Sequence, residues 1–242
     1  MKKTIITILS VFALLSANTF CASAQTNSYE AKRVTSYIKA SVTLNDFSFD
    51  NGTPKMFQIG DAAAVSSGPT VGYNAVVGFQ YRFVPGLGFY LGMDAGFGSR
   101  GMGVKLSLSP DLADVPVSVK GKVFTHCVKA SPLQLGYQFN ISDIFSIDVR
   151  IGGYVSYDFA GKFSVNAAVA GVSNTESRDI SEYKEFNRFD AGINPGVGLW
   201  FGPVGVDFTY QRGFVNINNE KYDSSAGKMY SQNFLLGVAY RF

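Results

Sequence analysis

The sequence predicts an all-β fold, an eight-stranded antiparallel up-and-down barrel, from three observations. Apolar residues alternate with small or polar residues in eight segments, as in 71–83 and 145–159. The connections between these segments are alternately short and long along the chain. Glycines recur on the polar side of the segments, as the crowded interior of a narrow barrel requires. Together these features predict a transmembrane β-barrel with short periplasmic turns and long external loops.

Each strand is predicted from its own alternation. The eight expected strands span residues 38–44, 71–83, 87–97, 133–139, 145–159, 189–201, 204–214 and 234–242. Three hairpins follow from tight connections at Val84-Pro85-Gly86, at residues 140–143 and at Gly202-Pro203, because proline, glycine, asparagine, serine and aspartate favour turns. Eight is the smallest even number of strands that closes a bacterial outer-membrane barrel.

The chemistry of the two strand faces distinguishes a membrane barrel from a soluble sandwich, which would show the same alternation. In 71–83 the odd positions are apolar, whereas Gly72, Asn74 and Arg82 lie among the even ones. Aromatic residues gather near the short turns, including Phe83 and Phe139. We therefore expect the apolar face to contact lipid and the aromatics to form a periplasmic girdle.

Alternation also places charged residues on the lumen side of the strands. They are Lys39, Arg82, Asp94, Asp148, Arg150, Asp158, Asp190, Asp207 and Arg241, with either Gln211 or Arg212 beside them. An eight-stranded barrel has room for side chains and little water, so opposite charges are expected to pair across strands. The sequence predicts a lumen filled by this structural charge network. The alternative is a narrow channel gated by the same pairs.

The N-terminus has the features of a secretory signal peptide. Lys2 and Lys3 precede an apolar run over 5–15 and then Ala22-Ser23-Ala24, an A-x-A cleavage pattern. We expect residues 1–24 to be removed and residues 25–242 to form a single outer-membrane barrel domain. Removal leaves 19 basic and 18 acidic residues, a net charge of +1, which gives no electrostatic basis for binding nucleic acid.

The long connections span residues 46–70, 100–127, 160–187 and 215–232. Loops of this length usually have a function of their own. The second contains alternating apolar residues, so the third and fourth strands are expected to extend beyond the membrane as a ribbon. A β-bulge is expected at Gly101-Met102-Gly103, where the alternation shifts.

Several strands resemble a known family. The stretches 38–44, 77–83, 131–137 and 236–242 are similar to the small outer-membrane β-barrel domain often called PorT-like, which is related in architecture to OmpA/OmpX-type barrels. The resemblance covers essentially the whole mature chain. It implies a porin-like barrel in the outer membrane of a Gram-negative bacterium, and it implies no catalytic motif.

The C-terminal strand has a second possible role. Phe234, Leu236, Val238, Tyr240 and the terminal Phe242 alternate along it. This pattern resembles the C-terminal signal that the outer-membrane insertion machinery recognises. An ordinary lipid-facing strand explains every one of these residues except the aromatic at the last position.

Evidence for chemistry is weak. His126 is the single histidine, and some outer-membrane barrels hydrolyse lipid or peptide with a histidine, so a hydrolase using His126 is an alternative. The sequence offers no specific partner for it, and Cys127 is expected to face lipid. Glu176, Asp179, Glu182 and Glu185 form an acidic group, but Arg178 and Lys184 interrupt it and its spacing fits no calcium loop.

The sequence therefore predicts a non-catalytic surface barrel with no cofactor and no metal site. Its expected partners are outer-membrane lipid, the insertion machinery during biogenesis, and an unidentified extracellular ligand or protein that contacts the external loops.

Overall fold

The computed structural model describes residues 32–49, 63–85, 87–108, 117–169, 172–180, 186–219 and 228–242. The expected signal peptide, residues 1–24, lies outside the described residues and stays a prediction. Among the described residues, no helix is long and apolar enough to cross a membrane.

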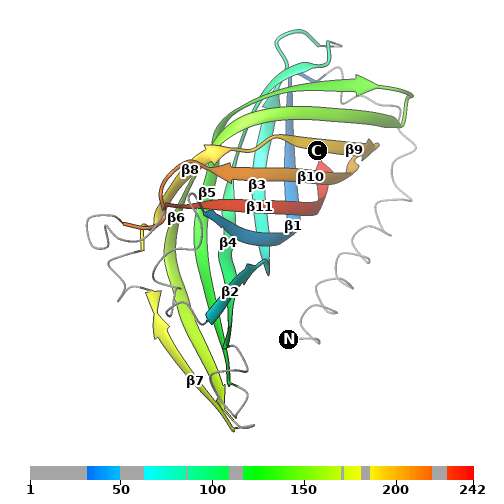
Figure 1. Ribbon diagram of the computed structural model, residues 1–242. Coiled ribbons are helices and arrows are strands. Elements are labelled where there is room, and N and C mark those ends of the chain that lie inside the picture. Colours follow the sequence, from blue (N-terminus) through cyan, green and yellow to red (C-terminus); the bar gives the residue numbers. More distant parts are fainter. Residues whose placement is uncertain are drawn as a thin grey trace.

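Strands make up one antiparallel sheet that closes on itself (Figure 1). They are β1 Val34–Phe49, β2 Ala63–Gly68, β3 Thr70–Tyr81, β4 Phe89–Leu108, β5 Val117–Asn140, β6 Phe145–Val169, β7 Val172–Asp179, β8 Phe189–Ile193, β9 Gly196–Phe201, β10 Val204–Gly213 and β11 Met229–Arg241. The ring runs β1, β3, β4, β5, β6, β8 with β9, β10 and β11, and β11 pairs again with β1. The predicted eight-stranded antiparallel barrel is confirmed.

One position in the ring is shared by two short strands. β8 and β9 both pair with β6 on one side and with β10 on the other. Asn194 and Pro195 separate them. Proline has no backbone N–H to donate to the ladder, which explains why the strand predicted over 189–201 is interrupted.

The two faces of the strands have the chemistry that the alternation predicts. Val77, Phe79 and Leu236 point outward and are 63%, 43% and 60% exposed, respectively. Asn74 and Gln80 point inward and are 4% and 7% exposed. Because apolar side chains cover the outside and polar side chains fill the inside, the barrel is suited to a lipid surrounding.

The long connections contain more strand than we expected. β4 and β5 continue as the predicted ribbon, to the pair Ser107 and Ser118. β6 continues to Val169 and pairs with β7, so much of the connection predicted over 160–187 is strand. β2 lies in the first long connection and pairs with the outer part of β4. Figure 1 shows these segments extending well beyond the ring of paired strands.

The predicted bulge at Gly101-Met102-Gly103 is wrong, because β4 pairs with β5 without interruption through these residues. Gly101 serves close strand packing instead, since a Cβ there would lie 2.3 Å from the backbone oxygen of Val123. A bulge lies in β5 near Pro132, where three residues of β5 match two on each neighbouring strand. This bulge reverses which positions of β5 face inward.

The short turns lie together at one end of the barrel with a group of aromatic rings. Ring centroids lie 5.3 Å apart for Tyr81 and Phe83, 4.6 Å for Tyr137 and Phe139, 4.9 Å for Phe145 and Phe201, and 5.0 Å for Tyr240 and Phe242. The turn between β9 and β10 uses Gly202, whose φ of 57° favours glycine. This end corresponds to the predicted aromatic girdle.

An apolar cluster lies at the opposite end of the lumen, which we call the mouth cluster. It consists of Phe47, Met102, Val104, Ile217 and Met229, none more than 7% exposed, with Phe186 packed against it. Ile217 belongs to the segment after β10, and its backbone N–H donates to the Met229 oxygen at 2.8 Å. The segment after β10 therefore folds over the strand ends and packs apolar side chains across the mouth.

Candidate functional site: the barrel lumen and the external rim

The lumen contains the charged residues that the sequence placed there. Lys39, Arg82, Asp148, Arg150, Asp158, Asp190, Asp207 and Arg241 are each at most 8% exposed. Asp94 is partly buried. Of the two neighbours left open, Gln211 is the buried one, at 5% exposure, whereas Arg212 is partly exposed and donates to Gln232. These side chains form three groups along the barrel axis.

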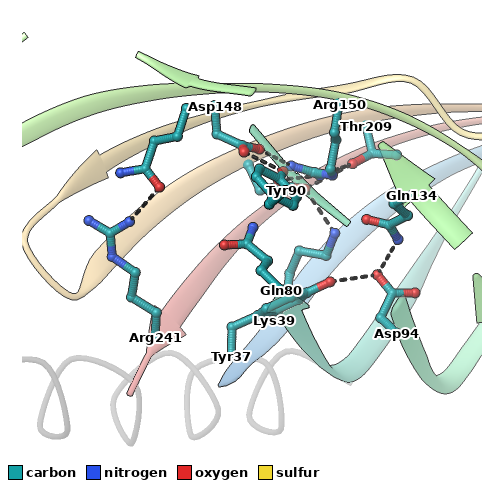
Figure 2. Close-up of polar contacts among 12 residues, drawn as sticks. Tyr37, Lys39, Gln80, Tyr90, Asp94, Gln134, Asp148, Arg150, Thr209 and Arg241 are labelled. Atoms are coloured by element: carbon teal, nitrogen blue, oxygen red, sulfur yellow. Dashed lines mark hydrogen bonds and ion pairs between the residues drawn. The ribbon is translucent and has the colours of Figure 1, made fainter. Parts of the chain in front are cut away.

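The central group connects three walls of the barrel through ion pairs. Lys39 Nζ on β1 lies 3.1 Å from Asp207 Oδ1 on β10. Arg150 on β6 bonds to Asp207 through Nη2 and to Asp148 through Nη1, the latter at 2.9 Å. Tyr90 from β4 donates its hydroxyl to Asp148 (Figure 2). Both carboxylates therefore have a cationic partner inside the barrel, which low dielectric makes necessary.

Asp94 lies beside this central group and has neutral partners. The Tyr37 hydroxyl donates to Asp94 Oδ2 at 3.0 Å, and Gln134 Nε2 donates to the same oxygen at 2.8 Å. Figure 2 shows these side chains converging from β1, β4 and β5. Tyr37 and Gln134 were not among the residues selected from the sequence, because neither carries a charge.

The external group is centred on Arg100, which sequence reasoning missed. Its guanidinium is fully buried and bonds to Asp158 at 3.1 and 2.5 Å, and Nη1 lies 2.9 Å from Asp190 Oδ2. Tyr154 and Ser231 also donate to Asp190, at 2.9 and 2.5 Å. Four strands are thereby joined across the lumen, namely β4, β6, β8 and β11.

The periplasmic group contains two arginines near the short turns. Arg82 and Arg241 both donate to Gln138 Oε1, at 2.7 and 3.2 Å. Arg82 also donates to Thr35 at 2.9 Å, and the Arg241 guanidinium lies 4.7 Å from the ring centroid of Trp200. Hydrogen bonds and a cation–π contact therefore hold these cations at the base of the lumen.

Glycines leave space for the large side chains of the lumen. A Cβ at Gly136 would lie 2.1 Å from the Tyr90 ring, and one at Gly205 would lie 2.6 Å from the Trp200 ring. The opposing strand thus has no side chain where each ring lies. The lumen is packed in the way that the recurring glycines predicted.

One wall of the outer lumen is polar but neutral. Buried side-chain atoms of Ser41, Thr43, Asn45, Asn74 and Asn233 have no hydrogen-bond partner within the protein among the residues described. This wall lies between the mouth cluster and Lys39.

Residues 23–219 match the family model described as outer membrane protein beta-barrel domain. The chain belongs to this family. The protein is therefore located in the outer membrane of a bacterium, as the sequence predicts. The match supports the family at this level and does not extend to the narrower PorT-like name.

The solved structures to which this chain is similar have low sequence identity to it. Ail of Yersinia pestis is 12% identical, with a TM-score of 0.34, covering 87% of this chain and 100% of Ail. OprG of Pseudomonas aeruginosa is 12% identical, with a TM-score of 0.38, covering 87% of this chain and 97% of OprG. The protease OmpT of Escherichia coli is 10% identical, with a TM-score of 0.36, covering 91% of this chain and 99% of OmpT. No curated protein matches the sequence. Likeness at this level carries no information about activity.

His126 lies on the outer face of the outer-membrane barrel. Its Nδ1 is 2.9 Å from the Tyr73 hydroxyl, and its ring contacts Phe124 and Phe159 at centroid distances of 5.4 and 6.5 Å. Within the described part of the chain, Tyr73 is its single hydrogen-bond partner. This aromatic surrounding is typical of the membrane interface.

The expectation that Cys127 faces lipid is wrong. Its side chain is fully buried, on the lumen side of β5. The cause is the bulge near Pro132, because alternation extended backward from 133–139 across this bulge assigns every earlier residue to the wrong face. Lys129 was missed for the same reason, and its Nζ donates to Gln211 at 3.1 Å inside the barrel.

The acidic residues of the third long connection are only partly described. Glu176 and Asp179 lie on β7 and are exposed, and Glu176 is 3.9 Å from Arg178. Glu182 and Glu185 lie outside the described residues. Among the residues described, no group of His, Cys, Asp and Glu side chains is arranged to hold a metal ion.

The predicted insertion signal lies on β11 and on Phe242, which directly follows this strand. Phe234, Leu236, Val238 and Phe242 are 41–60% exposed on the lipid face, and Tyr240 is partly exposed. This exposure fits both a lipid-facing strand and a recognised signal. The signal therefore stays a prediction.

Proposed function

We propose that this protein is a non-catalytic, non-conducting barrel of the outer membrane whose external strand extensions contact a partner or ligand at the cell surface. The observation that carries the proposal is the filled lumen. Side chains occupy it at three levels, and the mouth cluster lies across its external end.

Ion passage would require both barriers to open. At the central level, Lys39 and Arg150 both form ion pairs with Asp207, and the three residues come from three strands. Separating a buried ion pair without a replacement partner costs several kcal/mol. At the mouth, Ile217 and Met102 are fully buried, and moving them into water is unfavourable as well. The polar, neutral wall of the outer lumen thus lies between the ion pairs of the central group and the mouth cluster.

The external extensions support a contact role. β4 with β5, and β6 with β7, are paired strands beyond the ring and not unpaired chain. Glu176 and Arg178 are exposed on this part. Paired strands hold surface side chains in fixed positions, which favours recognition of a partner.

Planar-bilayer recording tests the non-conducting state. The wild-type barrel, shown to be folded by its mobility shift on an unboiled gel, is expected to give no steady conductance at neutral pH. The quadruple variant Met102→Ser, Ile217→Ser, Arg150→Ser and Asp207→Ser weakens both barriers and is the positive control. Steady conductance from the wild type would overturn the proposal in favour of the narrow channel.

The hydrolase alternative depends on His126. Purified barrel and a His126→Ala variant are incubated with outer-membrane phospholipid and with a peptide library. We expect no product from either protein above the buffer control. Hydrolysis by the wild type that His126→Ala abolishes would establish the enzyme instead.

A further inference from the structure

Four lysines share the outward face of the external extension. Lys105 on β4, Lys120 and Lys122 on β5, and Lys162 on β6 are all exposed. Lys105 pairs in register with Lys120. Lys122 pairs with Ser164 and Phe124 pairs with Lys162, and paired residues point to the same face of a sheet. We call these residues the lysine face.

The lysine face has little charge compensation within the described part of the chain. No carboxylate oxygen of a described residue lies within ion-pair distance of any of its four ammonium groups. Asp179 on β7 is in register with Lys162 and is the acidic residue on the same row. Lys105 and Lys120 stand directly opposite each other, and like charges in that position destabilise a sheet. An external anion would relieve this repulsion.

The position of the lysine face along the barrel axis, relative to the membrane interface, indicates the source of that anion. Phe124, His126 and Phe159 form an outward aromatic group that begins on the row of Lys162 and continues toward the ring, and Lys122 Nζ lies 5.0 Å from the Phe124 ring centroid. Aromatic residues of membrane barrels lie at the interface between hydrocarbon and head groups. Lys120 is four residues beyond Phe124, about 13 Å along a strand. The ammonium groups are therefore at the level of lipid head groups.

Below the aromatic group, the same strands offer an apolar surface. Val128 and Phe97 are 41% and 58% exposed and lie in register on β5 and β4. A single lipid could thus place its acyl chains along Val128 and Phe97 and its phosphate on the lysines. A soluble anion or an acidic protein would contact the lysines alone, whereas a lipid can contact both surfaces.

We propose that the lysine face binds the phosphate groups of a phosphorylated glycolipid in the outer leaflet. Lysine ammonium groups near a membrane surface each contribute about 1 kcal/mol toward anionic lipid. Four of them on three adjacent rows of a fixed sheet would select lipid with more than one phosphate. The proposal depends on the outward contact role proposed above and not on the closed lumen, which conductance tests separately.

Native mass spectrometry of the full barrel tests the proposal. The barrel is exchanged from vesicles that contain bisphosphorylated lipid A, or the same lipid with its phosphates removed, into detergent, and bound lipid is counted. We expect at least tenfold greater retention of the phosphorylated lipid. Replacing all four lysines with glutamine should abolish this preference, whereas replacing them with arginine should preserve it.

Lys228 supplies a matched control, because it is exposed immediately before β11, a strand that does not pair with β4, β5 or β6. Lys228→Gln is expected to retain lipid like the wild type. Equal retention of both lipids by the wild type would overturn the proposal, as would an unchanged preference in the folded glutamine variant. Displacement of the lipid by millimolar inorganic phosphate would also overturn it, by indicating a site for a soluble anion.

Discussion

Arg100 balances two acidic residues at the external level of the lumen. It is fully buried and bonds to Asp158 and to Asp190, which are both fully buried as well. Removing the arginine would leave two carboxylates without their cation in a low-dielectric interior. The loss in folding free energy comes mainly from the two buried carboxylates that remain without a cation, and less from the ion pairs that are lost.

We therefore expect Arg100→Leu to lower the free energy of unfolding by about 3–5 kcal/mol. A triple variant that adds Asp158→Asn and Asp190→Asn removes the charges together and should recover most of the loss. Urea titration of the folded band on unboiled gels measures the change. Arg178→Leu is the control, because its contact with Glu176 is long and exposed, and it should have almost no effect. If the triple variant is no more stable than Arg100→Leu, charge imbalance is not the cause.

A second prediction concerns Gly136, where a Cβ would lie 2.1 Å from the Tyr90 ring. Gly136→Ala should displace this ring from Asp148 and destabilise the barrel by about 1–3 kcal/mol, the usual cost of overpacking. Gly153→Ala on the neighbouring strand is the control, since its nearest contact would be 3.8 Å away. The temperature at which the folded band disappears checks both variants. Equal temperatures for the two variants would contradict the packing argument.

Prediction from sequence succeeded for single residues where alternation is unbroken. It placed Lys39, Asp148 and Asp207 on the polar side of their strands, and these residues are buried. It failed for Arg100 and Cys127 for two physical reasons. Arg100 precedes a glycine-rich stretch that looks like a loop, and Cys127 lies beyond a bulge that reverses the faces of β5.

At the scale of elements, strand ends were the weakest part of the prediction. β6 alternates through Phe163 and Val165, but the residues beside them, Lys162, Ser164 and Asn166, resemble a solvated loop. Beyond the membrane an outward-facing residue meets water or head groups, so the apolar face that marks a strand in lipid disappears. The ring of eight strands was predictable because lipid contact imposes an alternation of apolar and polar residues. The extensions lack this alternation and are recognisable as strands only from their backbone pairing in the structure.

The extension of β4 and β5 should be separable from the ring. Replacing residues 105–120 with Asn-Gly would leave Val104 paired with Gly121 and close the hairpin with a two-residue turn. We expect the shortened barrel to keep its mobility shift on boiling, because the three lumen groups and the ring pairing remain. Loss of the shift in outer-membrane fractions would show that the extension is needed for folding.

The end of β11 should affect assembly more than stability. Phe242 is 54% exposed, so Phe242→Ala removes little packing. We expect slower appearance of the folded band in cells and an unchanged urea midpoint after refolding in detergent. Phe208→Ala, at a position 48% exposed on the lipid face of β10, is the control and should assemble at the normal rate. Normal assembly of Phe242→Ala would eliminate the predicted insertion signal.

At the scale of the whole molecule, the two ends of the barrel differ in what they present. The short-turn end carries aromatic pairs and the bonded arginines, whereas the other end carries the mouth cluster, the paired extensions and the lysine face. An orientation with the extensions outside the cell brings the lysine face to the outer leaflet. The opposite orientation would place it at the periplasmic leaflet and remove the basis for binding an outer-leaflet glycolipid.

Orientation can be measured by cysteine labelling, since Cys127, the single cysteine outside the expected signal peptide, is buried and should not react. Intact cells expressing Glu176→Cys or Ser142→Cys are treated with a membrane-impermeant maleimide. Glu176 lies on exposed β7 and should be labelled, whereas Ser142 lies in a short turn and should be labelled only after lysis. The wild type, treated in both ways, reports any reaction of Cys127. Labelling of Ser142→Cys in intact cells would invert the topology, and the surface contact role and the glycolipid proposal would then both be wrong.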